Sequence, residues 1–214
     1  MKENIRGIIF DLDGTLFDSC GMWHQIDVDF FKKRNMDIPK DYNKKIAPLG
    51  LAKAAEFTKS EYGIKESIEE IIKEWHDMAV YEYTYNVNIK PFVKEYLELC
   101  KNKGLKLAIA TANDEEFYMP ALKRNRIEQY FDFICDVNEY KGTKNTPDIY
   151  LHVANSLNLS PCDMAVFEDI PRAIKSAKEG GFFVVAVDDA HEVDFVDEKK
   201  KLADRFIYSF DELL

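Results

Sequence analysis

Short apolar runs, separated by amphipathic segments, are the feature that most constrains how this chain can fold. The runs lie at residues 8–10, 105–110, 131–135, 165–167 and 182–187. Continuous apolar runs of this length, bounded by turn residues, are typical of strands that helices cover on both faces. Strands that alternate with helices favour a parallel sheet with right-handed crossovers. We therefore predict an α/β fold whose core is a Rossmann-like, doubly wound parallel sheet.

The two segments that flank the fourth run carry helix signals. In residues 146–161, Thr146 can cap a helix and Pro147 can occupy its first position. Residues 168–181 repeat apolar side chains at helical spacing and end in a pair of glycines. We predict a crossover helix in each segment.

One long segment after the first run interrupts this alternation. It shows no convincing strand pattern, and its helical patterns lie at residues 21–34, 51–63 and 67–79. The last of these begins with a capping box formed by Ser67 and Glu70. We therefore predict an all-helical cap domain at residues 17–88, inserted into an α/β core formed by residues 1–16 and 89–214.

Composition narrows the classes of partner. The formal net charge of −10 disfavours a nucleic-acid partner, which requires a basic face. No apolar run is long enough to cross a bilayer, and charge appears too early for a signal peptide, so we expect no membrane association and a cytoplasmic protein. The four cysteines and four histidines lack the spacing of a zinc or redox site. We expect reduced thiols and a small-molecule partner.

Acidic residues follow the first and fourth apolar runs. They are Asp11 and Asp13 after the first run and Glu168 and Asp169 after the fourth. In an extended chain, Asp11 and Asp13 point to the same side, roughly 7 Å apart, and repel unless a cation lies between them or one holds a proton. Each acid alone also fits a solvated turn. Because the carboxyl ends of parallel strands share one edge, the four together indicate a Mg²⁺ site with oxygen ligands.

Two further residues complete a set suited to phosphoryl chemistry. Thr111 follows the second run, and Lys144 precedes the predicted helix at 146–161. Either residue alone is ordinary. Phosphoryl transfer, however, needs a nucleophile, a hydroxyl or N–H group on the phosphate oxygens, a cation and a metal. The helix start near Asn113 and Asp114 can also offer N–H groups to an anion.

Four motifs occur in a fixed order along the chain: "FDLDGTLFDS", "IATAND", "TKNTPDIY" and "VFEDIPRAIKSAKEGG". Together they resemble the haloacid dehalogenase superfamily, in its phosphatase and phosphomutase branch. The resemblance covers nearly the whole predicted core, and a helical insertion after the first motif corresponds to the cap of that family. It implies an enzyme that acts on a phosphate ester.

The resemblance also implies catalytic roles. Asp11 would be the nucleophile that becomes an aspartyl phosphate. Asp13 would protonate the leaving oxygen and then accept a proton from water, which requires a raised pKa. Thr111 would bind phosphate oxygens, and Lys144 would neutralise charge on the nucleophile and the phosphoryl group.

The same resemblance implies the ligands. Mg²⁺ would be held by Asp11, the backbone carbonyl of Asp13, and Asp169, with Glu168 supporting directly or through water. The residues implied to bind substrate are Gly14, Ala112, Asn113 and, in the cap, Lys53. Lys53 resembles a position at which mutases use an arginine, although a solvated helix lysine explains this residue better. The partner would be a small phosphorylated metabolite.

Phosphatases and sugar-phosphate mutases share all of these core residues. The cap decides whether water or a second sugar hydroxyl reaches the aspartyl phosphate. Trp23 stands where well-studied mutases carry a histidine, and His24 follows one place later. A shift of one residue turns a helical side chain by about 100°. We therefore favour hydrolysis of a phosphate monoester, with a beta-phosphoglucomutase-like mutase as the alternative.

Two other functions remain open but disfavoured. A dehalogenase needs neither the second aspartate nor Mg²⁺, so Asp13, Glu168 and Asp169 argue against it. A non-catalytic phosphate-binding protein would be expected to have lost one of the core residues, and none is missing. We expect a monomer or a weak homodimer.

Overall fold

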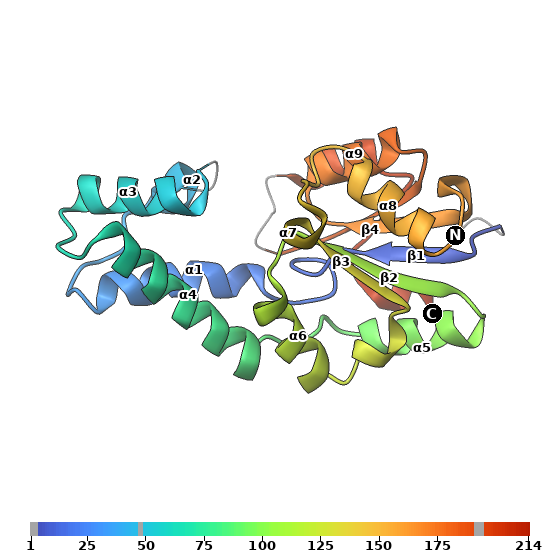
Figure 1. Cartoon of the computed structure of the whole chain (residues 1–214), viewed down its shortest axis with the longest axis horizontal. Helices are drawn as coiled ribbons and strands as arrows, with labels where there is room; N and C mark the ends of the chain where they lie inside the picture. The colour runs from blue at the N-terminus through green and yellow to red at the C-terminus, as the bar shows by residue number, and fades with distance from the viewer. Residues whose placement is uncertain (1–3, 47–48, 191–194) are drawn as a thin grey trace. The chain divides into compact units, whose positions relative to one another are not determined.

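The chain divides into two compact units, which we describe separately (Figure 1). A computed structural model describes residues 4–46, 49–190 and 195–214. One unit combines residues 1–20 with residues 87–214, and the other spans residues 21–86. The predicted cap of residues 17–88 thus extends a few residues further at each end than the second unit does. None of the helices in the described residues has the length and apolar character that a bilayer crossing requires.

The first unit is built on a parallel sheet with the strand order β3-β2-β1-β4-β5-β6. The strands are β1 (Gly7–Phe10), β2 (Lys106–Thr111), β3 (Phe133–Asp136), β4 (Met164–Glu168), β5 (Phe183–Val187) and β6 (Arg205–Ile207). All neighbouring strands pair in parallel, so the predicted α/β fold and its parallel sheet are confirmed. β6 was not predicted, because two of its three residues are only partly buried and no apolar run marks it.

The strand order reverses between β1 and β4. From β1 the chain first builds β2 and β3 on one side, and then crosses to build β4, β5 and β6 on the other. β1 and β4 are buried along their whole length because each has a strand on both sides and helices over both faces. A switch of this kind leaves a crevice at the carboxyl ends of the two central strands, where parallel sheets bind ligands.

Helices cover both faces of this sheet (Figure 1). They are α5 (Val93–Asn102), α6 (Glu115–Arg124), α7 (Val137–Tyr140), α8 (Asp148–Ser156), α9 (Pro171–Glu179) and α10 (Val196–Leu202), with short 3-10 helices at Glu128–Tyr130, Pro161–Asp163 and Phe210–Leu213. On one face, α8 and α9 bury Val153 and Ile174 against Ile9 of β1. On the other, Phe10 and Phe167 pack against Tyr96 of α5. The doubly wound arrangement follows from this alternation of side chains.

The predicted start of the helix at 146–161 is wrong by one residue. Helix α8 begins at Asp148, and Pro147 precedes it with a φ of −69° and a ψ of −7°. The Thr146 hydroxyl does not cap the helix but donates to the Asp148 carboxylate at 2.8 Å. The proline therefore starts the turn just outside the helix, while the carboxylate of the first helical residue takes the threonine hydroxyl.

The second unit is all-helical, as predicted for the insertion. Its helices are α1 (Cys20–Lys32), α2 (Tyr42–Ile46), α3 (Leu51–Tyr62) and α4 (Ile68–Tyr85). The predicted capping box at the start of α4 is confirmed: Ser67 accepts from the Glu70 N–H at 3.1 Å, and Glu70 accepts from the Ser67 N–H at 2.7 Å. The five residues of α2 are too few to show a periodic pattern, which is why it was not predicted.

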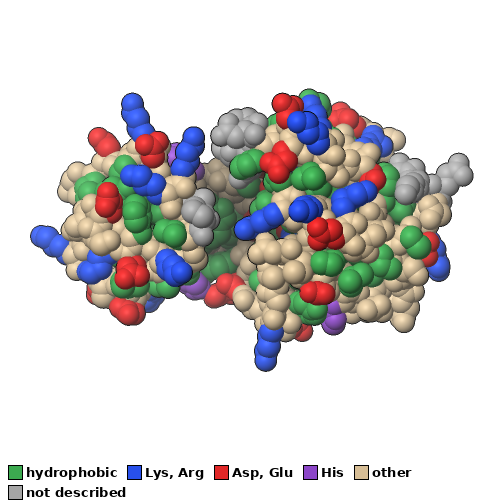
Figure 2. Space-filling view, turned by 90° about the horizontal axis from the view of Figure 1, so that it is seen from above, with side chains coloured by type: hydrophobic (Ala, Val, Ile, Leu, Met, Phe, Trp, Pro, Cys, Tyr) green, Lys and Arg blue, Asp and Glu red, His purple; other side chains and the backbone are tan. Residues whose placement is uncertain are grey.

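The core of the helical unit is aromatic. Phe31 packs edge-to-face on Tyr42 with ring centroids 4.9 Å apart, and Phe30 lies 5.3 Å from Trp75. The Arg34 guanidinium lies 3.7 Å from the centre of the Phe30 ring and forms ion pairs with carboxylates of the following segments. On the face seen in Figure 2, cationic and anionic side chains are interspersed over both units.

The two chain segments that connect the units are paired with each other inside the first unit. Phe17 forms an antiparallel bridge with Ile89. The Asp18 N–H donates to the Asn88 carbonyl at 2.9 Å. The insertion therefore leaves and re-enters the α/β core through two adjacent strands of backbone.

A buried acid in the helical unit predicts a pH-dependent stability. Burial raises the pKa of Asp27 in α1 to about 7. Because the folded-state pKa exceeds the unfolded value near 4, the stabilising contribution is complete below pH 4 and is lost as the pH rises through 7. We expect the wild type to lose on the order of 4 kcal/mol of unfolding free energy from this group, and Asp27→Asn to lack that loss.

Urea denaturation at several pH values between 4 and 8 tests this expectation. Asp29→Asn is the matched control, because Asp29 is an exposed acid on the same helix. A pH dependence in Asp27→Asn as steep as that of the wild type and of Asp29→Asn would contradict the expectation.

Candidate active site

The carboxyl ends of three neighbouring strands carry predicted site residues. Asp11 directly follows β1, Thr111 ends β2, and Glu168 ends β4. Asp169 is the next residue of the chain. The Asp11 N–H donates to the Phe167 carbonyl at 3.0 Å, so the bonding between β1 and β4 continues to the first acid. These residues therefore meet at the edge of the sheet where the strand order reverses.

The Lys144 ammonium bridges two of these acids. Lys144 lies in the loop between α7 and α8, and its Nζ is 2.5 Å from Asp11 Oδ1 and also contacts Glu168 Oε1. The Tyr150 hydroxyl, from α8, donates to the same Glu168 oxygen at 2.7 Å. The fold thus brings a lysine from a distant loop onto the first and fourth motifs.

The charges in this cluster are not balanced. Burial lowers the pKa of the Lys144 ammonium, but the Asp11 and Glu168 carboxylates outweigh burial and hold that pKa above its ordinary value. Burial raises the pKa of Glu168 to about 7, against the opposing effect of Lys144. Burial, and then the Asp11 charge, raise the pKa of Asp169. The Lys199 and Lys144 charges oppose this rise at Asp169, but its pKa stays raised, so these cations supply too little positive charge for the three neighbouring carboxylates.

The donor set fits a hard divalent cation. Asp11, Glu168 and Asp169 each offer one carboxylate oxygen, and these oxygens all lie within 4.8 Å of one another. Within the described part of the chain, Glu168 Oε2 and Asp169 Oδ1 are buried without a hydrogen-bonding partner. Leaving buried acceptors unpaired is costly, and an ion such as Mg²⁺ binds all-oxygen sites of this kind.

Asp13 is held by two hydrogen bonds from side chains. Its carboxylate accepts from the Ser19 hydroxyl at 2.6 Å and from the Asn113 side-chain amide at 2.9 Å. The Asn113 N–H in turn donates to Thr111 Oγ1 at 3.0 Å. Sequence reasoning placed Asn113 at the substrate and did not find Ser19, whose only signal is its place in the first motif.

Gly14 lies directly against Asp169 of the acid cluster. Its φ is +76°, and a Cβ atom there would overlap Asp169 Oδ2 and lie 2.8 Å from Asp169 Cγ. It would also lie 3.0 Å from Cys20 Sγ. Burial, and then the Asp169 charge, raise the pKa of the Cys20 thiol, which disfavours the thiolate form of this sulfur. The turn after Asp13 therefore needs glycine for both conformation and space.

Residues 8–187 match the family model described as haloacid dehalogenase-like hydrolase. The chain belongs to this family. Apart from Gly7, the first residue of β1, the match includes the first five strands of the sheet and the helical unit between β1 and α5. The family resemblance of the four motifs is therefore confirmed, and the cluster around Asp11 lies within the matched region.

Relatives of this haloacid dehalogenase-like hydrolase include enzymes of two kinds. It is 28% identical over 177 residues to a phosphorylated carbohydrates phosphatase of Thermotoga maritima, covering 83% of this chain and 82% of the relative. It is 26% identical over 197 residues to the beta-phosphoglucomutase of Bacillus subtilis, covering 86% and 83%. The solved beta-phosphoglucomutase of Clostridium difficile has the same fold, with a TM-score of 0.74 at 24% identity over 98% of this chain and 93% of its own.

These relatives support an enzyme with hydrolase or phosphomutase activity. The phosphatase and mutase functions weighed from the sequence both remain in agreement with the comparisons. Because the two reactions use the same core chemistry, the geometry around Asp11 does not choose between them.

The crowding at Gly14 of this haloacid dehalogenase-like hydrolase predicts a damaging substitution. We expect Gly14→Ala to cost about 1 kcal/mol for its backbone conformation and a further 1–3 kcal/mol for the overlap with Asp169. Gly104→Ala is the matched control, because Gly104 has a φ of +74° in the same unit and no atom within 4 Å of an added Cβ. Thermal unfolding should therefore separate the two variants.

The catalytic activity of the Gly14→Ala variant should also be lost, since displacing the Asp169 carboxylate disturbs the acid cluster. Equal losses of stability in Gly14→Ala and Gly104→Ala, with activity kept, would contradict the crowding that the structure indicates.

The remaining predicted substrate residues, Ala112 and Lys53, belong to different units of the chain. Ala112 is exposed directly after Thr111, at the edge of the sheet that carries the acids. Lys53 is exposed on α3 and belongs to the helical unit, whereas the acid cluster belongs to the other unit. His24 is also exposed in that unit, and its Nδ1 lies 3.0 Å from the Asn43 side-chain amide.

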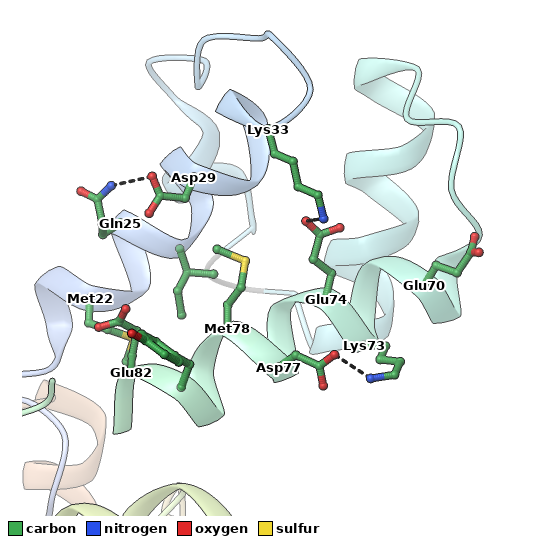
Figure 3. Close-up of a pocket in the computed structure, with 12 residues that line it drawn as sticks. Met22, Gln25, Asp29, Lys33, Glu70, Lys73, Glu74, Asp77, Met78 and Glu82 are labelled. Atoms are coloured by element: carbon green, nitrogen blue, oxygen red, sulfur yellow. Dashed lines mark hydrogen bonds and ion pairs between the residues drawn. The ribbon is translucent and has the colours of Figure 1, made fainter. Parts of the chain in front are cut away.

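A cavity of about 640 Å³ lies in the helical unit between α1 and α4 (Figure 3). Its apolar lining includes Met22, Ile26 and Met78. Several polar groups of its lining bond to one another: Lys33 lies 2.9 Å from Glu74, Lys73 lies 2.6 Å from Asp77, and Gln25 donates to Asp29 at 3.0 Å. Each of these two lysines therefore has an acidic partner within the lining of the cavity.

Proposed function

We propose that this protein is a Mg²⁺-dependent phosphatase that hydrolyses a small phosphate monoester through an aspartyl phosphate on Asp11. The observation that carries the proposal is the Lys144 ammonium on Asp11 and Glu168, beside buried carboxylate oxygens that lack a partner. A carboxylate can attack a phosphate dianion only where positive charge offsets their repulsion.

The proposed reaction has two steps. In the first, an Asp11 carboxylate oxygen attacks phosphorus, the bond from phosphorus to the ester oxygen breaks, and Asp13 gives that oxygen a proton. In the second, Asp13 takes a proton from water, whose oxygen attacks the aspartyl phosphate. Inorganic phosphate leaves, and Asp11 returns to its free carboxylate. Ser19 and Asn113 hold the Asp13 carboxylate for this exchange of protons.

The ligands of the proposed metal are the carboxylates of Asp11, Glu168 and Asp169 and the backbone carbonyl of Asp13. When bound, the ion supplies the positive charge that the cluster lacks and draws negative charge away from the phosphoryl oxygens. Lys144 adds a second positive charge, which its raised pKa keeps in place at neutral pH.

The phosphoryl oxygens need donors at the same edge of the sheet. We propose that the Thr111 hydroxyl and the backbone N–H group of Ala112 provide them, with Gly14 and Asn113 lining the same part of the substrate site. Lys53 of the helical unit is proposed to meet the substrate from the cap. This part of the proposal rests on the family resemblance.

The proposed substrate is a small phosphorylated metabolite. Phosphorylated carbohydrates are the first class to examine, because the similar Thermotoga maritima protein carries that substrate in its name. We further propose a cytoplasmic enzyme that acts as a monomer or weak homodimer, without a nucleic-acid or membrane partner.

A mutase is the second candidate, favoured by the similarity to the Bacillus subtilis beta-phosphoglucomutase. Against it, Trp23 stands at the place of the mutase histidine, and the neighbouring His24 is already bonded to Asn43. We therefore rank the phosphatase first.

A panel of phosphorylated metabolites, supplied with Mg²⁺, tests the choice. We expect inorganic phosphate to accumulate with at least one sugar or polyol phosphate. Conversion of a hexose 1-phosphate to its 6-phosphate without phosphate release would favour the mutase. Neither product from any ester would count against both activities.

A further inference from the structure

Lys90 makes an unusual set of contacts for a lysine that no motif includes. Its Nζ donates to the Gly14 carbonyl at 2.5 Å and to the Asp188 carbonyl at 2.7 Å. It also forms an ion pair with Asp189 Oδ2 at 2.9 Å. The side chains of Lys90 and Asp189 are 13% and 2% exposed, so this pair is largely shielded from solvent. One ammonium therefore joins the turn after β1 to the end of β5.

The backbone of Lys90 is tied to the same turn. Its N–H donates to the Leu16 carbonyl at 2.8 Å. The turn also closes on itself, since the Gly14 N–H donates to the Phe17 carbonyl at 3.0 Å. Lys90 thus holds the turn at two points, once through its main chain and once through its ammonium.

Lys90 holds the turn at Gly14, a position with no space for a larger side chain. Gly14 directly follows Asp13 and has no room for a Cβ beside the Asp169 carboxylate. The Gly14 carbonyl belongs to the peptide between Gly14 and Thr15. A rotation about the Gly14 backbone bonds would move this peptide relative to Asp13, the proposed acid and base, and so shift Asp13 relative to Asp169, a proposed metal ligand. The Lys90 ammonium bonds the Gly14 carbonyl and so opposes this rotation.

We propose that Lys90 is a positioning residue, which fixes the Gly14 peptide and thereby keeps Asp13 in register with Asp169. Lys90 acts through Gly14 and does not touch the substrate. The inference rests on the proposed function for its catalytic consequence, whereas the restraint on the turn is independent of it. The ion pair with Asp189 holds the lysine side chain in place.

The test removes the pair without leaving a buried charge unpaired. The double variant Lys90→Met/Asp189→Asn loses the ammonium and neutralises its partner together. Lys90→Arg keeps a cation at the same position. The matched control is Lys178→Met/Asp204→Asn, because Lys178 and Asp204 form a 2.6 Å ion pair in the same unit, and Asp204 is bonded to Val184 near the opposite end of β5.

Two measurements are needed. Amide hydrogen exchange, read without Mg²⁺, should speed up by about 10-fold or more at residues 14–17 in the double variant and stay unchanged in the control. In steady-state kinetics, we expect kcat to fall about 10–100-fold with KM within about 3-fold, as for residues that orient a reacting group. Lys90→Arg should recover most of kcat.

Unchanged exchange at residues 14–17 in the double variant would overturn the restraint. Faster exchange with an unchanged kcat would overturn the catalytic role, as would an equal fall of kcat in the control pair. If the wild type releases no phosphate from any ester, the proposed function fails, and the exchange measurement still decides whether Lys90 holds the turn.

Discussion

Asp11→Asn is expected to reduce phosphate release by at least about 10³-fold, because the carboxamide cannot act as the nucleophile that forms an acyl phosphate. The wild type, quenched in acid during turnover of a ³²P-labelled ester, should carry label on the protein, and the variant should not. This measurement separates the loss of the covalent step from a loss of substrate binding.

The variant should remain folded. The Asp11 charge raises the pKa values of Glu168 and Asp169, which means that the three acids repel one another without a metal. Lys144 keeps its contact with Glu168 when Asp11 is neutralised. We therefore expect the metal-free Asp11→Asn protein to melt no lower than the wild type. Undiminished turnover and labelling in a folded variant would reject Asp11 as the nucleophile.

A second large effect is expected from Mg²⁺, and it should grow with pH. The folded-state pKa of Glu168, about 7, is raised above an unfolded value near 4.5. The stabilising contribution of this acid is thus complete below pH 4.5 and lost as the pH rises through 7, at a cost of about 3 kcal/mol to the metal-free protein. We expect Mg²⁺ to bind the ionised carboxylates and to offset that loss.

Melting temperatures measured with and without Mg²⁺ at pH 5 and pH 8 test this linkage. We expect a clear rise with Mg²⁺ at pH 8 and little change at pH 5. Asp27 titrates over the same range but belongs to the other unit, and its contribution cancels in the comparison with and without the ion. Glu168→Gln should show a smaller Mg²⁺ effect. Equal stabilisation at both pH values would contradict the linkage.

Much of the fold and of the candidate site can be predicted from the sequence, because the patterns that mark the strands and the residues after them are local. Apolar runs marked β1 to β5, and in a parallel sheet the residues after each run must meet at one edge. The sequence alone therefore predicts that Asp11, Thr111 and Glu168 lie close together. β6 and α2 were missed because three and five residues, respectively, show no periodic pattern.

The contacts that sequence could not reveal are those made over long distances along the chain. Lys90 bonds to carbonyls that lie 76 and 98 residues away, and backbone carbonyls carry no signature of residue type. Asn113 was recognised, but its bond to Asp13 spans 100 residues and depends on how two strand ends face each other. Local sequence patterns thus identify the candidate catalytic residues but not the side chains that hold them in position.

The paired connections at Phe17–Ile89 and Asp18–Asn88 have an evolutionary consequence. Because the two junctions are adjacent, residues 19–87 form an insertion whose ends lie close together. The length of such an insertion has little effect on the stability of the sheet. Mutation can reshape, shorten or replace that module while Asp11, Thr111 and Glu168 keep their places at the strand ends. Changes in the helical unit can therefore accumulate without a change in the acid cluster of the core.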